Sequence, residues 1–171
     1  MRRWGNLTLR SKALKILEDV ESTGNVAKLK AIMDMHKYKY YEFTPDKNNK
    51  TANLLGAVDH NNKRIFVNEW MPLKERHFIL AHEIGHVILH PGDNHADFRR
   101  HPPINDDTES EANVLAYELV MPFDKFIKSF KKYKGDVSIL SDKFLVPEKN
   151  VRQRIKFLKK QVESGRVDEF E

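Results

Sequence analysis

The stretch His82-Glu83-Ile84-Gly85-His86 lies inside an apolar run that extends from Phe78 to Leu89. In an α-helix, residues four positions apart share one face, so the two histidine side chains would project about one turn from each other. Two neutral imidazoles in this arrangement can bind one Zn²⁺ ion, and Glu83 beside them can take a proton from a water molecule. The stretch therefore has the H-E-x-x-H pattern of zinc-dependent peptidases.

A pattern of five residues also occurs by chance, and the alternative is a pair of core histidines that are hydrogen-bonded to the backbone. Imidazole and carboxylate groups on so apolar a helix would each cost a few kcal/mol if they had no partner. Gly85, between the two histidines, indicates that a second backbone or a substrate approaches the helix closely. These features favour the metal site over the alternative.

Composition indicates a globular chain of one domain, or of one domain with a small appendage. The 171 residues are 40% hydrophobic and include no Cys, which excludes thiolate ligands and favours a cytoplasmic location. We expect no signal peptide and no membrane partner, because no run approaches the roughly 18 apolar residues of a membrane span. A net charge of +5 with 32% charged residues favours a mixed solvated surface over a nucleic-acid surface.

The residues before the motif predict helices and a small sheet. Apolar periodicity predicts helices over Ser11–Ser22 and Val26–Met35, and aromatic alternation predicts an edge strand over Tyr38–Phe43. Two short apolar runs, 54–58 and 64–67, flank an Asn-rich segment and predict a β-hairpin. The expected fold class is α+β, with a three-stranded antiparallel sheet packed against the motif helix.

Two histidines do not complete a catalytic zinc site, which usually has three protein ligands and a fourth position for water. The segment His90–Asp107 is rich in Pro, Gly, Asn and Asp and is interpreted as a long loop, and helical character returns over Thr108–Val120. The candidates for the third ligand are Glu109, Glu111, His90, His95 and His101.

Periodicity distinguishes the two acids. Glu109 lies three residues before Ala112 and continues the apolar face of its helix, whereas Glu111 is about 200° around the helix from it and faces solvent. Asn113 is placed to hydrogen-bond a ligand histidine, and small residues at 112 and 116 would let this helix pack closely against the motif helix. The predicted ligand set is therefore His82, His86 and Glu109.

Peptide hydrolysis at such a site needs a general base and a further donor to the developing oxyanion. Glu83 is the predicted catalytic base. The candidates for the transition-state donor are Tyr117, His95 and His101, and the sequence does not discriminate among them.

Several motifs together resemble the ImmA/IrrE family of small zinc metallopeptidases. The run His82–His90 is preceded by Ile65–Asn68 and Met71-Pro72, and it is followed by Glu109–Asn113 and Glu118–Pro122. The resemblance implies a minimal, gluzincin-like zincin fold with two His and one Glu on zinc. For a member of this family it also implies a protein substrate, namely a helix-turn-helix repressor of a phage or mobile element.

The C-terminal part resembles the helix-turn-helix-like tail of the same family. We predict a metallopeptidase domain over residues 1–134 and a helical extension over 135–171, with helices over Val137–Phe144 and Asn150–Val162. A basic second helix could neutralise DNA phosphates, but a packing appendage or a dock for an acidic protein is favoured. Its basic residues are Arg152, Arg154, Lys156, Lys159 and Lys160.

A second class of function also fits the motifs. The zinc fold could serve as a non-hydrolytic scaffold in a regulatory, toxin–antitoxin or immunity pair, with or without DNA contact. The intact Glu83 favours the enzyme, because a scaffold has no chemical need for a general base beside the metal.

Overall fold

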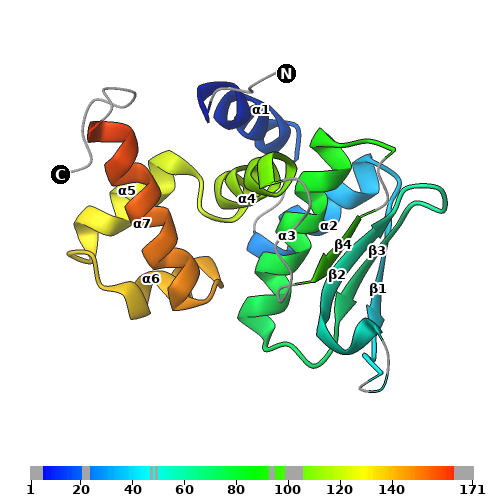
Figure 1. The fold of residues 1–171 in the computed structure, drawn as a ribbon. Coiled ribbons are helices and arrows are strands. Elements are labelled where there is room, and N and C mark those ends of the chain that lie inside the picture. Colours follow the sequence, from blue (N-terminus) through cyan, green and yellow to red (C-terminus); the bar gives the residue numbers. More distant parts are fainter. Residues whose placement is uncertain are drawn as a thin grey trace.

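The computed structural model describes residues 6–20, 24–46, 48, 50–92, 95–98 and 106–163 (Figure 1). None of the helices in these ranges is long and apolar enough to cross a membrane. In chain order the elements are α1 (Asn6–Glu18), α2 (Asn25–Met35), β1 (Lys39–Phe43), a 3-10 turn (Lys50–Asn53), β2 (Leu54–Asp59), β3 (Arg64–Asn68), α3 (Leu73–Leu89), β4 (His95–Phe98), α4 (Asp106–Val120), α5 (Phe123–Lys132), α6 (Val137–Phe144) and α7 (Glu148–Glu163).

The sheet has four strands in the order β1-β3-β2-β4 and is mixed. The predicted hairpin is confirmed, since β2 and β3 pair antiparallel. The prediction of a three-stranded antiparallel sheet is wrong in two respects. β1 lies beside β3 and runs parallel to it, and β4 adds an antiparallel strand to the other side of β2. β4 falls inside the segment interpreted as a loop, because the polar composition of that segment gives no strand pattern, and the strand is defined by its pairing with β2.

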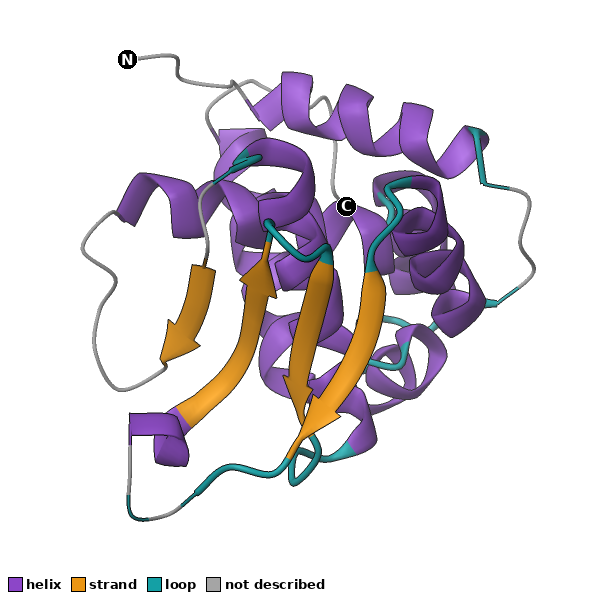
Figure 2. Ribbon diagram, turned by 90° about the vertical axis from the view of Figure 1, so that its right-hand side faces the viewer, coloured by secondary structure: helices purple, strands orange, loops and turns teal. Residues whose placement is uncertain are grey.

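Helices cover one face of the sheet, and Figure 2 looks onto the other face, with β1 and β4 at its two edges. Strand alternation explains this arrangement, because Ile65 and Val67 of β3 are fully buried while Phe66 between them points the opposite way. On the outer face Phe66 stacks with Tyr41 of β1 at a centroid distance of 5.6 Å. The inner face supports α3.

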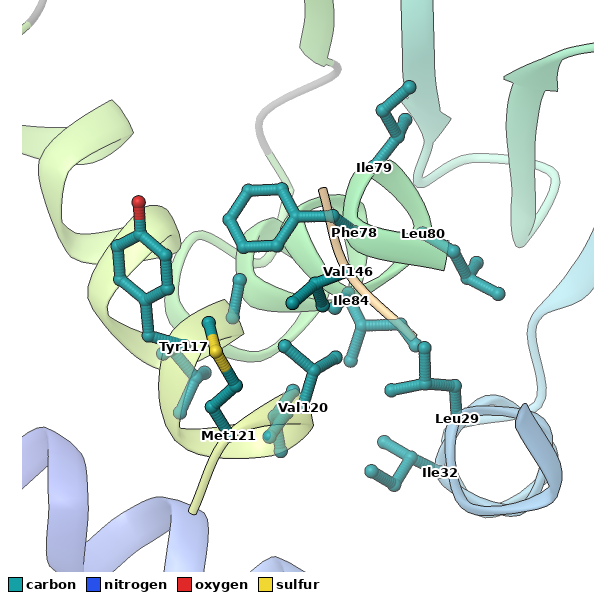
Figure 3. Packing of buried hydrophobic residues seen from close by; sticks show 14 of the residues in the cluster. Leu29, Ile32, Phe78, Ile79, Leu80, Ile84, Tyr117, Val120, Met121 and Val146 are labelled. Atoms are coloured by element: carbon teal, nitrogen blue, oxygen red, sulfur yellow. The ribbon is translucent and has the colours of Figure 1, made fainter. Parts of the chain in front are cut away.

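The helix α3 runs through the middle of the molecule, and every residue from His77 to Val87 is buried. A helix that is buried on all sides can keep β-branched residues and a glycine, because packing rather than intrinsic propensity stabilises it. Phe78 and Ile84 of α3 pack in one core cluster with Tyr117 and Val120 of α4 (Figure 3). Ile32 of α2 belongs to the same cluster. This central position fixes the orientation of the motif.

The helices α5, α6 and α7 gather at the opposite end of the molecule from the sheet, with α4 between (Figure 1). The fully buried Arg154 of α7 donates to Glu118 Oε1 of α4 over 2.7 Å and to the carbonyl of Met121 over 3.2 Å. His77 Nδ1 of α3 lies 2.9 Å from the carbonyl of Leu145, at the turn between α6 and α7. The predicted boundary between a metallopeptidase domain and a C-terminal extension at residue 134 stays a prediction. The contacts of Arg154 and His77 join residues on the two sides of this boundary.

Replacing Arg154 by Ala should lower the free energy of unfolding by about 3–5 kcal/mol, because the Glu118 carboxylate would stay buried without its counter-charge. The control is Arg152→Ala, whose side chain is 65% exposed and pairs with Glu148 at the surface. That variant should lose less than about 0.5 kcal/mol in urea unfolding. Equal losses in the two variants would contradict the assignment of a stabilising buried ion pair.

Candidate metal centre

The histidines of α3 meet at their Nε2 atoms. His82 and His86 are both buried, and their Nε2 atoms lie 3.1 Å apart. The four-residue spacing on one helix face produces this approach, as the sequence predicts. Two ring nitrogens are thus presented to one point beside α3.

Glu109 reaches the same point from the first turn of α4. Its Oε2 lies 3.3 Å from His82 Nε2, and its Oε1 lies 3.3 Å from His86 Nε2. The three side chains form a group that could hold a metal ion, with ligand atoms within 4.8 Å of one another. The structure therefore brings the three predicted ligands together.

The spacing of the donors fits zinc. Two ligand atoms that are each ~2.0–2.1 Å from a tetrahedral zinc ion lie ~3.3–3.4 Å apart. The two Nε2 atoms, 3.1 Å apart, are close to that separation, and each lies 3.3 Å from a different oxygen of the Glu109 carboxylate. Two imidazoles and one carboxylate are also a donor set of catalytic zinc sites, and three ligands leave one tetrahedral position for water.

The protonation of the histidines suits metal binding. Asn113 Oδ1, on the same face of α4 as Glu109, accepts a hydrogen bond from His82 Nδ1 over 3.2 Å. This bond places the proton on Nδ1, so that the lone pair of Nε2 points into the cluster. Burial lowers the pKa of His86 from its ordinary value, which favours the neutral ring that a metal requires.

The backbones of α3 and α4 are in direct contact at Gly85. A Cβ at Gly85 would lie 2.8 Å from the carbonyl oxygen of Ala112 and 3.0 Å from its Cα. Only a residue without a side chain fits this position, and the fully buried Ala112 is the small residue that faces it. The close approach expected from Gly85 is thus the contact that carries Glu109 to the histidines.

Glu83 lies between α3 and the sheet and is 0% exposed. A Cβ at Gly56 of β2 would lie 2.4 Å from Glu83 Oε1, so this glycine leaves the space that the carboxyl group occupies. Gly56 is not among the site residues predicted from the sequence. Its signal is a glycine at a buried strand position, which commonly marks close approach of another group.

The remaining predicted site residues have other surroundings or lie outside the described residues. His90 Nε2 donates to the carbonyl of Thr108 over 3.2 Å, and Glu111 is 3.8 Å from the same nitrogen. Burial raises the pKa of Tyr117 to about 12, and its hydroxyl donates to Gln153 Oε1 of α7 over 2.7 Å, rather than to the cluster. His101 and the side chain of His95 lie outside the described part of the chain.

Comparison with known families gives an independent result. The model of the IrrE N-terminal-like domain (Peptidase_M78) matches residues 35–156. The chain belongs to this family. Family membership suggests a metallopeptidase or a regulator, and the matched residues include the whole cluster and extend well into α7.

The proteins to which the chain is similar include one from a phage and one of known structure. "Uncharacterized immunity region protein 2" of Bacillus phage phi105 is 36% identical over 74 residues, which cover 43% of this chain and 46% of the phage protein. A Mycobacterium tuberculosis transcriptional regulator has a similar fold, with a TM-score of 0.62 at 18% identity over 85% of this chain and 46% of that chain. In both comparisons, the chain spans less than half the length of the other protein.

A side chain at position 85 should separate the two helices that carry the ligands. We expect Gly85→Ala to weaken zinc binding about tenfold or more and to cost ~1–3 kcal/mol of stability, because the new methyl group overlaps the Ala112 backbone. Gly24→Ala is the control, since a Cβ there meets no atom within 4 Å. Competition with a chromophoric chelator measures the affinity, and wild-type affinity in Gly85→Ala would refute the role of this contact.

Proposed function

We propose that the chain is a zinc-dependent endopeptidase that hydrolyses a peptide bond in a protein substrate. The observation that carries this proposal is the convergence of His82, His86 and Glu109, whose ligand atoms lie within 4.8 Å of one another, with the buried carboxyl of Glu83 in the adjacent helix position. Membership in a family described as peptidases supports the same reaction class.

Each residue has a defined part in this reaction. His82, His86 and Glu109 would hold the zinc ion, which when bound polarises a peptide carbonyl and lowers the pKa of water toward neutrality. Glu83 accepts the proton that the attacking water loses and returns it to the nitrogen of the leaving amine, so the carboxylate is regenerated. Asn113 keeps the His82 ring in its binding tautomer through the bond to Nδ1.

The proposed substrate is a helix-turn-helix repressor of a phage or mobile element. Support comes from the name of the phage relative, which places that protein in an immunity region. A non-hydrolytic scaffold is less consistent with the site, because Glu83 is held fully buried in a space that Gly56 leaves open. Burial of a carboxyl group is costly and is commonly retained where catalysis uses it.

DNA contact through α7 has weaker support than its sequence suggests. Arg154 is buried against Glu118, and Arg152 pairs with Glu148 at 3.1 Å. Phosphate contacts by this helix would therefore rest mainly on Lys156, Lys159 and Lys160, which are exposed. The contacts of Arg154 favour a packing role for the C-terminal helices.

The direct test is incubation of the purified chain with the helix-turn-helix repressor encoded beside its gene. Glu83→Gln should keep one bound zinc ion and lose at least about 100-fold in cleavage rate, because the amide cannot accept the proton. A chelator should stop cleavage and added zinc should restore it.

The matched control is Glu111→Gln, which removes an acid near the cluster without touching the predicted ligands and should change the rate less than about twofold. Wild-type cleavage by Glu83→Gln would refute the mechanism. Tight binding of the repressor without any cleavage would instead favour the scaffold.

A further inference from the structure

The strand β1 forms an open edge of the sheet. The Lys39 N–H donates to the carbonyl of Lys63, and the Phe43 carbonyl accepts from the Glu69 N–H, so the odd-numbered residues of β1 pair toward β3. Alternation along a parallel ladder then directs the backbone N–H and C=O groups of Tyr40 and Glu42 away from the sheet. Within the described ranges, no strand pairs with this outer edge.

A groove of about 660 Å³ runs along the same edge, between β1, α2 and the first half of α3. Its apolar lining includes Val26 and Met33 of α2 and Leu73 and Leu80 of α3. Val26 is 52% exposed and Leu73 is 58% exposed, so two aliphatic side chains stand at the opening in contact with solvent. An open strand edge beside an apolar groove has both the main-chain groups and the side-chain space for an added strand.

The groove is separate from the metal centre. Leu73 and Leu80 are about 180–200° around α3 from His82, which places them on the opposite side of the helix. The cluster faces α4, and Glu83 faces Gly56 in β2, whereas β1 is at the far edge of the sheet beyond β3. Occupancy of the groove therefore leaves the ligand residues uncovered.

The charges of the groove favour an acidic ligand. Arg76 Nη1 of α3 and Glu42 Oε1 of β1 neutralise each other at 2.6 Å. Among the ionisable lining residues, Lys30, Lys39 and Asp34 have no ion-pair partner in the described part of the chain, which leaves an excess of one positive charge. An acidic side chain near the two lysines would satisfy this excess.

We propose that this groove binds an extended, acidic segment of a partner protein, which adds to the sheet as a strand beside β1. The backbone of the segment pairs with the outward N–H and C=O groups of Tyr40 and Glu42. Every second side chain of the segment is apolar and enters the groove against Val26, Met33 and Leu73, and a flanking acid faces Lys30 or Lys39. In this mode of recognition, main-chain bonds supply affinity and alternate side chains supply specificity.

Fluorescence anisotropy with a labelled heptapeptide probe tests the site on the full chain. The probe Glu-Leu-Thr-Val-Thr-Leu-Glu has alternating apolar residues, and its isomer Glu-Leu-Val-Leu-Thr-Thr-Glu has the same composition without the alternation. We expect the alternating probe to bind about tenfold more tightly than the isomer. Equal affinity for the two peptides would overturn the proposal.

Two pairs of variants locate the binding. Leu73→Asp should weaken binding of the alternating probe about tenfold, whereas Ile139→Asp, at a 44% exposed position on α6, should change it less than about twofold. Glu42→Pro removes the carboxylate side chain and the outward backbone N–H of residue 42. Glu42→Ala removes the carboxylate but keeps that N–H. We expect Glu42→Pro to bind about fivefold more weakly than Glu42→Ala. Unchanged binding in Leu73→Asp, or equal binding in the two Glu42 variants, would refute the assignment.

A second copy of the chain is the competing occupant. Sedimentation showing a dimer that Glu42→Pro dissociates, with no binding of the probe, would overturn the proposal in favour of edge-to-edge association. Glu83→Gln should bind the probe as the wild type does, because the Glu83 carboxyl faces Gly56 of β2, whereas the groove runs along β1 at the edge of the sheet. Failure of probe binding is therefore distinguishable from failure of the peptidase reaction.

Discussion

The contact between Gly85 of α3 and the backbone of Ala112 in α4 determines the geometry of the candidate metal centre. Glu109 lies one turn before Ala112, so its reach to the histidines depends on how closely the two helices approach. Larger side chains at these two positions would separate the helices and move the Glu109 carboxylate away from the two histidine nitrogens, which are only 3.1 Å apart. The small residues are therefore part of the ligand arrangement, although they donate nothing to a metal.

Two further contacts hold the ligand helices in place. On the sheet side, Gly56 makes room for the Glu83 carboxyl and lets α3 pack directly on β2. In the last turn of α4, Glu118 forms a buried ion pair with Arg154, which connects α4 to α7. The C-terminal helices thus stabilise the helix that carries Glu109 and Asn113, which gives them a structural role in the site even without a ligand of their own.

The sequence was sufficient to predict the features that depend on local pattern. The motif helix, the hairpin and the positions of Glu109 and Asn113 follow from periodicities of 3.6 and 2 residues. The parallel placement of β1 and the existence of β4 depend on pairing between distant segments, which no local pattern records. The sequence groups Arg154 with the other basic residues of its helix, but Arg154 lies on the apolar stripe of Val151 and Leu158, and a charge that is buried there requires a partner such as Glu118.

We propose that the close packing of α3 and α4 creates a zinc site from two imidazoles and one carboxylate. X-ray absorption spectroscopy at the zinc edge of the metal-loaded protein tests it most directly. We expect one zinc ion per chain with four nearest N or O neighbours at about 2.0–2.1 Å and multiple-scattering features of two imidazoles. We also expect Glu109→Ala to change the nearest-neighbour shell while keeping both imidazoles. A signal from one imidazole or from three, or a shell that Glu109→Ala leaves unchanged, would contradict the assignment.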